Sequence, residues 1–239
     1  MLISFSGKIV LVTGGTGGLG RAVSLAFLAE GATVAVTYRV PAEFAALQQA
    51  AGAAASSLSG HSVDVTSETA ATDLIASLVA THGRLDCLVN TVGGYAGGET
   101  VWEQQPSTLD RMLALNLRAT YTLARAVLGP MLRQHAGSIV TVSSRAALDH
   151  GPRASAYSAS KAAELALTGS LAAELNGTGV RINSIMPSII DTEANRKAMP
   201  DADFAAWPKP EELARVILFL SSDAASVIHG AAVPVYGSR

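Results

Sequence analysis

The stretch KIVLVTGGTGGLG, residues 8–20, decides the fold of this chain. Its apolar start predicts a buried strand over Lys8–Thr13, and a helix is predicted over Gly18–Glu30, ended by Gly31. The loop between them belongs to TGGTGGLG, with five glycines in eight residues. Residues without Cβ let the backbone approach a bound pyrophosphate, and the helix N-terminus offers free N–H groups. A strand, a glycine loop and a helix in this order favour dinucleotide binding over a merely flexible turn.

The rest of the chain repeats the alternation of short apolar strands and longer helices. Strands that are apolar on both faces indicate a parallel sheet covered by helices on both sides. We therefore predict one α/β domain over residues 1–239, a doubly wound Rossmann-type fold with about seven strands. Further strands are expected at Thr33–Tyr38, His61–Val65, Leu85–Asn90, Gly137–Ser144, Val180–Pro187 and Ala231–Gly237, the last at an edge because it contains Pro234. Further helices are expected from about Pro41, at Ser67–His82, at Pro106–His135 with a candidate break near Gly129–Pro130, at Ser155–Leu175 and at Lys209–Ser222.

Composition excludes several classes of protein. Of 239 residues, 49% are hydrophobic and 15% charged, which allows a large core. The net charge is −2 with scattered basic residues, so no nucleic-acid partner is expected. The longest uncharged stretch, Ala45–Val63, is too polar for a membrane span, and the start MLISFSGKIV does not read as a signal peptide. We expect a cytoplasmic protein with no membrane partner.

Cysteine and histidine usage argues against disulfide and metal chemistry. The single cysteine, Cys87, lies in the apolar run LDCLVN and is expected to be a buried, inert thiol. The five histidines are widely spaced and form no ligand motif, so we expect no metal site.

The residues that follow the second strand bear on the choice of dinucleotide. An NAD-type site usually has an acidic residue there, which binds the ribose hydroxyls. Here Tyr38 and Arg39 end the strand, and no acid follows until Glu43. A guanidinium can pair with a 2′-phosphate, so we predict a preference for NADP(H), with NAD(H) as the alternative. The simplest alternative for Arg39 is an ordinary surface arginine.

A second stretch, AYSASKAAELAL from Ala156, places Tyr157 and Lys161 one helical turn apart on one face. The chain has only four lysines, so the pair is either chance or an acid–base device. A free tyrosine, with a pKa near 10, is a poor acid–base group at neutral pH. A neighbouring ammonium favours the phenolate, so we expect Lys161 to lower the pKa of Tyr157.

Taken together, several motifs make the chain resemble the short-chain dehydrogenase/reductase family along essentially its whole length. The glycine loop also fits T-G-x-x-x-G-x-G, and the chain then has Asp64-Val65, NTVGG, Asn116, a serine pair, Y-x-x-x-K and a proline-led segment in the family's order. Each motif alone is weak, but their joint order is specific. The chain departs from the pattern at NTVGG, where Asn-Asn-Ala-Gly is usual, and at Ser188, which replaces glycine after Pro187.

The resemblance implies an NAD(P)-dependent oxidoreductase that transfers a hydride between nicotinamide and a carbonyl or alcohol. It implies that Tyr157 is the acid–base, that Lys161 also grips the ribose, and that Ser144 donates a hydrogen bond to the substrate oxygen, with Ser143 as its rival. Asn116 would help hold a relay water; a solvated helix face is the alternative. The expected cofactor-binding residues are Thr13, Gly14, Gly15, Thr16, Gly17, Gly18, Leu19, Gly20, Tyr38, Arg39, Asp64, Val65, Asn90, Gly93, Tyr157, Lys161, Pro187, Ile190 and Thr192.

The loop of about 187–208 is expected to be a substrate lid, since it is long and follows a strand at the carboxyl edge. Its Phe204 and Trp207 would either close over a flat substrate or pack the lid onto the body. Residues 92–98, 146–151 and 191–207 are also similar to the divergent dihydropteridine reductases. Those enzymes lack the serine, whereas this chain keeps Ser144. We therefore prefer a ketone or oxoacyl reductase, with quinonoid dihydropteridine or quinone reduction as the alternative and a non-catalytic nucleotide-binding scaffold as a third reading.

The two long helices, over residues 106–135 and 155–175, are rich in small apolar residues. In relatives they form a two-fold helix-bundle interface, although such faces could equally pack on the sheet. We expect a homo-oligomer, a dimer or a tetramer.

Overall fold

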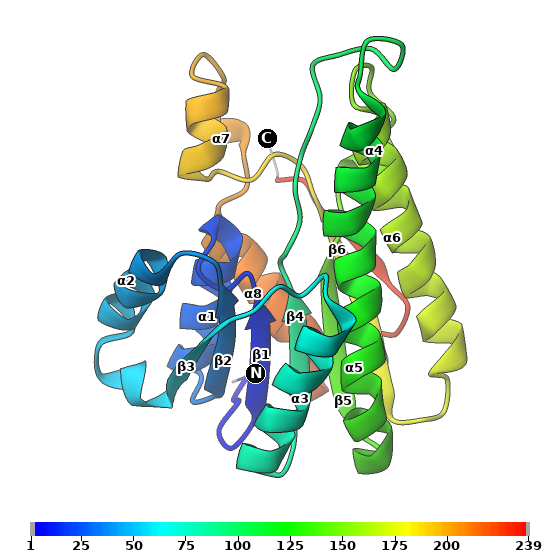
Figure 1. Ribbon diagram of the computed structural model, residues 1–239. Helices are drawn as coiled ribbons and strands as arrows, with labels where there is room; N and C mark the ends of the chain where they lie inside the picture. The colour runs from blue at the N-terminus through cyan, green and yellow to red at the C-terminus, as the bar shows by residue number, and fades with distance from the viewer. Residues whose placement is uncertain (1–2, 238–239) are drawn as a thin grey trace.

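The computed structural model describes residues 3–237 and contains a seven-stranded sheet in the order β3-β2-β1-β4-β5-β6-β7 (Figure 1). Every neighbouring pair is parallel, which confirms the predicted doubly wound fold. The strands are β1 (Ile9–Thr13), β2 (Thr33–Tyr38), β3 (Leu58–Ser62), β4 (Cys87–Asn90), β5 (Gly137–Val142), β6 (Val180–Pro187) and β7 (Ala232–Val235). The main helices are α1 (Gly18–Ala29), α2 (Pro41–Ala51), α3 (Glu68–His82), α4 (Pro106–Met112), α5 (Ala119–Gln134), α6 (Ser155–Glu174), α7 (Glu193–Ala198) and α8 (Pro210–Ser221).

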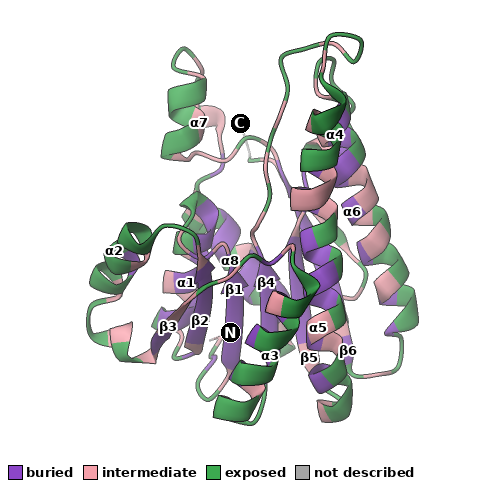
Figure 2. Cartoon of the chain, viewed as in Figure 1, coloured by how far each residue is buried: buried purple, intermediate pink, exposed green. Residues whose placement is uncertain are grey.

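Helices cover both faces of the sheet, because successive strand residues point to opposite sides. In β1, Val10 and Val12 belong to the core shared with α1 and α8, whereas Leu11 belongs to the core shared with α3 and α5. In Figure 1, α3 and α5 lie in front of the sheet and α8 lies behind it. Figure 2 shows the central strands buried and the outer faces of the helices exposed. No helix among residues 3–237 has the length and apolar character needed to cross a bilayer.

The third strand lies earlier than predicted. It runs over Leu58–Ser62 and pairs with β2 from Val34↔Leu58 to Tyr38↔Ser62, rather than over His61–Val65. Leu58 is its buried anchor, and Gly60 leaves room for the ring of Phe44, which a Cβ would meet. Asp64 and Val65 therefore lie in the loop beyond the strand. Several other ends also differ by one or two residues: β4 begins at Cys87, β5 ends at Val142 and β7 spans Ala232–Val235, paired with β6 at the predicted edge.

The predicted long helix is interrupted, but at a different place. Pro130 lies buried inside α5 without ending it, so the predicted break near Gly129–Pro130 is wrong. The irregularity is a π-helical turn, η2 (Leu113–Arg118), between α4 and α5. Such turns widen the helix locally and are frequent at functional sites. Asn116 lies within this turn and is buried, which excludes the solvated face.

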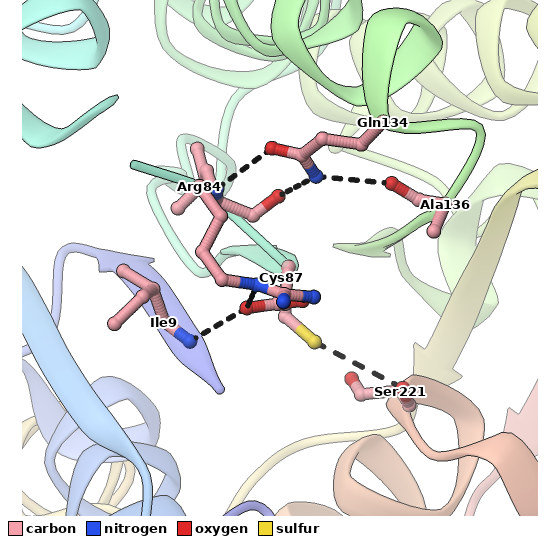
Figure 3. Close-up of polar contacts among 8 residues, drawn as sticks. Ile9, Arg84, Cys87, Gln134, Ala136 and Ser221 are labelled. Atoms are coloured by element: carbon pink, nitrogen blue, oxygen red, sulfur yellow. Dashed lines mark hydrogen bonds and ion pairs between the residues drawn. The ribbon is translucent and has the colours of Figure 1, made fainter. Parts of the chain in front are cut away.

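A polar network lies at the amino ends of β1 and β4, at the opposite end of these strands from the glycine loop (Figure 3). Asp86 accepts hydrogen bonds from the N–H of Ile9 and from Arg84, and Gln134 bonds both backbone groups of Leu85. Cys87 is buried beside this network, with Sγ 3.9 Å from the carbonyl oxygen of Ser221. Burial raises the pKa of its thiol to about 12, which confirms the inert thiol predicted from the sequence.

Candidate active site

The glycine loop follows β1 at the carboxyl edge of the sheet, where ligands bind in doubly wound folds. Gly14 has a positive φ of 68°, and its N–H donates to Oγ1 of Thr37 at 2.9 Å. A Cβ on Gly15 would lie 2.6 Å from the side chain of Val36, and one on Gly20 would collide with the carbonyl oxygen of Gly14. The loop is therefore bound closely to β2 and to its own helix, and side chains there would push the backbone apart.

A cavity of about 280 Å³ lies beside this loop. Its wall contains Arg39, Asp64 and also Glu43, whose Oε2 accepts a hydrogen bond from Oγ1 of Thr16 at 2.9 Å. Hydrogen bonds from Thr66 are the main cause of a lowered pKa at Asp64. The predicted residues that line the cavity are Gly14, Thr16, Gly17, Tyr38, Arg39, Asp64, Val65 and Gly93. Glu43 was not included among the expected cofactor-binding residues, because it lies on α2 rather than at the end of β2.

Asn90, at the end of β4, is bonded within the protein at both ends of its amide. Its Oδ1 accepts from Oγ1 of Thr13 at 2.7 Å and from the N–H of Val92 at 3.1 Å. Its Nδ2 donates to Oγ1 of Thr120 at 2.9 Å. Oγ1 of Thr91 donates to the carbonyl of Thr13 at 2.7 Å. The side chains of Asn90, Thr13 and Thr91 therefore connect the glycine loop to the loop after β4.

Asn116 connects that same loop to α6. Its Oδ1 accepts from the N–H of Gly94 at 2.8 Å, and its Nδ2 donates to the carbonyl of Gly94 at 3.0 Å and to Oγ of Ser160 at 2.8 Å. A Cβ placed on Gly93 would lie 3.0 Å from Oδ1 of Asn116 and 3.5 Å from Nζ of Lys161. The bare backbone of Gly93 therefore lies beside both predicted catalytic side chains.

Ser144 and Tyr157 form the acid–base end of the site. Ser144 follows β5, is buried, and its Oγ accepts from the N–H of Ala146 at 3.1 Å. Burial is the main cause of a raised pKa at Tyr157, and the hydrogen bond with Ser144 opposes it. The rival Ser143 instead donates from Oγ to the backbone carbonyl of Lys161 at 3.2 Å. Tyr95, which the sequence analysis did not single out, packs its ring edge-on to Tyr157 at 4.9 Å between centroids.

Lys161 lies one turn along α6, is buried, and donates from Nζ to the carbonyl oxygen of Val142 at 2.6 Å. Burial lowers its pKa, and Glu164 opposes that effect. The expectation that Lys161 lowers the pKa of Tyr157 is wrong in this structure. Removal from water dominates at both groups, and the ammonium is directed to a β5 carbonyl.

The segment after β6 covers the start of α1. Thr192 caps α7, since its Oγ1 accepts from the N–H of Asn195 at 3.2 Å. Its Cγ2 would lie 2.7 Å from a Cβ on Gly18. Pro187 is buried at the end of β6, and Ile190 packs against the core shared with α1. Figure 1 shows α7 above the carboxyl ends of the strands.

Phe204 and Trp207 lie farther along this segment, with ring centroids 5.1 Å apart. Arg196, paired with Asp191, lies 4.9 Å over the Phe204 ring. Both rings line a second cavity of about 700 Å³, together with residues of α8 and β7, and its lining includes none of Ser144, Tyr157 or Lys161. Of the two alternatives, this favours packing of the lid onto the body.

The fold and this constellation define a dinucleotide-binding oxidoreductase of the doubly wound class, and comparison with known proteins is consistent with that. The family model for short chain dehydrogenase matches residues 8–203. The chain is 31% identical to 3-oxoacyl-[acyl-carrier-protein] reductase FabG of Thermotoga maritima, over 97% of each sequence. It is 34% identical to L-rhamnose 1-dehydrogenase (NAD(P)(+)) of Sphingomonas, over 97% of this chain and 95% of that one.

A solved structure described as ElxO with NADP bound superposes with a TM-score of 0.91 at 28% identity, over 96% of this chain and 97% of that one. The chain belongs to the short-chain dehydrogenase/reductase family. It is an NAD(P)-dependent dehydrogenase or reductase, which sets aside the non-catalytic scaffold.

Proposed function

We propose that this protein reduces a ketone or oxoacyl carbonyl with NADP(H), using Tyr157 as the proton donor and Ser144 as the hydrogen-bond donor to the substrate oxygen. The observation that carries the proposal is that the Ser144 hydroxyl lies close enough to the Tyr157 phenol to lower its pKa, beside a glycine backbone that adjoins Lys161. Nicotinamide, when bound, supplies the hydride. The cavity beside the loop fits such a cofactor, because the bare backbone of Gly14 and Gly17 forms part of its wall.

The protonation state of Tyr157 supports the reductive direction. Because its pKa lies above the ordinary value, the phenol is protonated at neutral pH and can donate to an oxygen that gains negative charge. Ser144 accepts from the N–H of Ala146, and a substrate oxygen that enters beside Tyr157 would take the Ser144 O–H in place of the phenol. Asn116 holds the loop after β4 against α6, through its bonds to Gly94 and Ser160, so the reacting groups keep their positions.

Arg39 supports NADP(H) as the preferred cofactor, with NAD(H) as the alternative. It is exposed in the wall of the cavity beside the glycine loop, where a guanidinium could pair with a 2′-phosphate. Glu43 lies in the same wall and would favour unphosphorylated ribose. Adenine would lie against Asp64 and Val65, and Pro187, Ile190 and Thr192 would flank the nicotinamide. One relative is named for use of both dinucleotides. In this chain, the balance between the positive charge of Arg39 and the negative charge of Glu43 would decide the preference.

The reduction of a quinonoid dihydropteridine or a quinone is the second candidate. Tyr95 favours it, because its ring stands edge-on to Tyr157 and is two-thirds exposed, at 66%. An exposed aromatic face at this position would stack against a flat ring system. The similarity to an oxoacyl reductase and the retention of Ser144 support the carbonyl reading instead.

The test is NADPH oxidation by the purified protein against ketones, an oxoacyl thioester, quinones and quinonoid dihydropterin. Tyr157→Phe should remove turnover by about 10²–10⁴-fold while leaving NADPH binding intact. Ser144→Ala should cost about 10²–10³-fold on a carbonyl substrate, and Ser77→Ala, on the exposed face of α3, is the matched control. Pterin turnover that survives Ser144→Ala would favour the second candidate. Absence of turnover on every compound would contradict both.

The domain and assembly predictions also stay proposals. Residues 1–239 would form one domain with a lid at about 187–208, and α5 and α6 would form a two-fold interface in a dimer or tetramer. Tyr121 is half-exposed on α5, which supports a partner for that face. Light scattering at working concentration tests this, and particles of only 24.4 kDa would contradict it.

A further inference from the structure

Glu164 is a buried carboxylate that the reaction scheme does not use. It lies on α6 with 1% of its surface exposed. Among residues 3–237, neither of its carboxylate oxygens has a hydrogen-bond partner. Burying an unpaired carboxylate costs several kcal/mol, so such a group needs a compensating interaction close by.

The position of Glu164 indicates what that interaction is. It lies three residues after Lys161 and seven after Tyr157, so the three side chains lie along one face of the helix. Lys161 is 5% exposed, and its only hydrogen bond within the described chain goes to the carbonyl of Val142. An ammonium has three donors, so this buried cation has capacity for a further partner. A buried ammonium and a buried carboxyl group therefore lie on adjacent turns, each incompletely hydrogen-bonded and not in direct contact with the other.

The elements around α6 supply no competing buried charge. The side chains of η2 and β5 that reach its buried face are uncharged, namely Asn116 bonded to Ser160 and Thr141 beside Thr168. The charged residues of α4 and η2 are exposed, namely Asp110, Arg111 and Arg118. In the short helix η3 (Arg145–Ala147), Arg145 forms an exposed pair with Asp149 in the turn that follows. Arg181 of β6 donates instead to the carbonyls of Ser222 and Ile228.

We propose that Glu164 is a positioning residue of this active site, whose carboxylate, without a direct ion pair to Lys161, stabilises the charged Lys161 ammonium beneath Tyr157 through the protein interior. The proposal rests on the function proposed above. Electrostatics supports it independently of the geometry: burial lowers the pKa of Lys161, and Glu164 raises it. At Tyr157, burial is the largest cause of the raised pKa and Glu164 adds to it. The carboxylate thus favours the charged form of Lys161 and the protonated form of Tyr157.

The test measures Lys161 itself, so it does not depend on knowing the substrate. The chain has four lysines, so ¹³Cε-lysine labelling gives four resonances, and Lys161→Met identifies the one of interest. In Glu164→Gln the Lys161 titration should move to lower pH, and weakening of NADPH binding should begin at lower pH. Glu174→Gln removes the same charge from the exposed end of α6 and should leave the Lys161 curve unchanged.

A Lys161 titration that is identical in wild type and Glu164→Gln would overturn the proposal. If Glu164→Gln does not fold, Glu164→Asp keeps the charge but withdraws it by one methylene, and the Lys161 curve should still move to lower pH. A wild-type curve in that variant would equally overturn it. None of these readouts needs turnover. Failure of the substrate panel would therefore contradict the proposed function, whereas only the Lys161 titration tests the role of Glu164.

Discussion

The side chain of Asn116 holds both backbone groups of Gly94, 22 residues earlier in the chain, through bonds of 2.8 and 3.0 Å. Its third bond, to Ser160, attaches the same loop to α6. Asn116 can reach all three because the π-helical turn carries it out of the regular helical path. The loop that bears Gly93 is therefore fixed to the helix that bears Tyr157 and Lys161.

Asn116→Ala should both destabilise the protein and weaken cofactor binding. The substitution leaves the half-buried polar groups of Gly94 without their partner, which costs at most about 1–3 kcal/mol for each group. Chemical denaturation measures the stability, and NADPH titration measures the loosening of the loop at Gly93. Asn176→Ala, at an exposed position after α6, is the control. Wild-type NADPH affinity in Asn116→Ala would show that the loop does not depend on this side chain.

Gly18→Ala should disturb the segment after β6 through Thr192. The new Cβ would lie 2.7 Å from Cγ2 of Thr192, which is too close for real atoms. Thr192→Ser removes that methyl and keeps the hydroxyl that caps α7, so the double variant should recover part of the loss. A double-mutant cycle on unfolding free energy should give a coupling of about 0.5–3 kcal/mol. Gly17→Ala, whose Cβ would meet Gly14 at an ordinary 3.4 Å, serves as the stability control. Strictly additive effects would contradict the contact.

Substitutions at Arg39 and Glu43 should change cofactor choice in opposite directions. Arg39→Ala should reduce the ratio of kcat/KM for NADPH over NADH by about 10–100-fold, the value of a charge-assisted hydrogen bond. Glu43→Gln should raise that ratio, because it removes a negative charge from the cavity wall. Arg111→Ala, on the exposed face of α4, should change nothing. If the ratio is unchanged in Arg39→Ala, the predicted preference for NADP(H) is wrong.

Cys87 should make stability fall at alkaline pH. Its pKa rises from 9.0 to about 12 on folding, so the folded protein holds the thiol proton more tightly than the unfolded chain. The resulting stabilisation is complete below pH 9 and is lost as the pH rises towards 12, at about 1.4 kcal/mol per pH unit. Unfolding free energies at pH 8 and 10 should therefore differ by about 1 kcal/mol more in the wild type than in Cys87→Ala. Rapid thiol labelling of the folded protein at pH 8 would contradict the burial on which this depends.

The sequence predicted the parallel sheet well because each of its strands is a short apolar run with helices between. It placed β3 three residues late because HSVDV is β-branched, whereas pairing with β2 selects the run that buries Leu58. It suspected a break at Gly129–Pro130, where local propensity is poor, but buried packing keeps α5 continuous through Pro130. The irregular turn at Asn116 has no local signal, since LALNLR reads as ordinary helix.

The site shows the same division. Motif spacing identified Ser144, Tyr157 and Lys161 as candidates, and in the structure the Ser144 hydroxyl lies close enough to the Tyr157 phenol to affect its pKa. The sign of the pKa change at Tyr157 was predicted wrongly, because helical spacing gives a distance between residues but not their exposure to water. Glu43, Tyr95 and Glu164 were not assigned to the site for a related reason: each lies in or near a quoted stretch, but the stretch does not show which side chains are brought to the site.

By itself, the sequence determined the order of strands and helices, the glycine loop and the family to which the chain belongs. These follow from patterns within a few residues, where backbone geometry and apolar spacing dominate. Only the tertiary structure decided which residues are removed from water, as Glu164 and Lys161 are, and which distant groups meet, as Asn116 meets Gly94 and Thr192 meets Gly18. Burial and long-range contact are properties of packed elements, and they set the charges on which the chemistry depends.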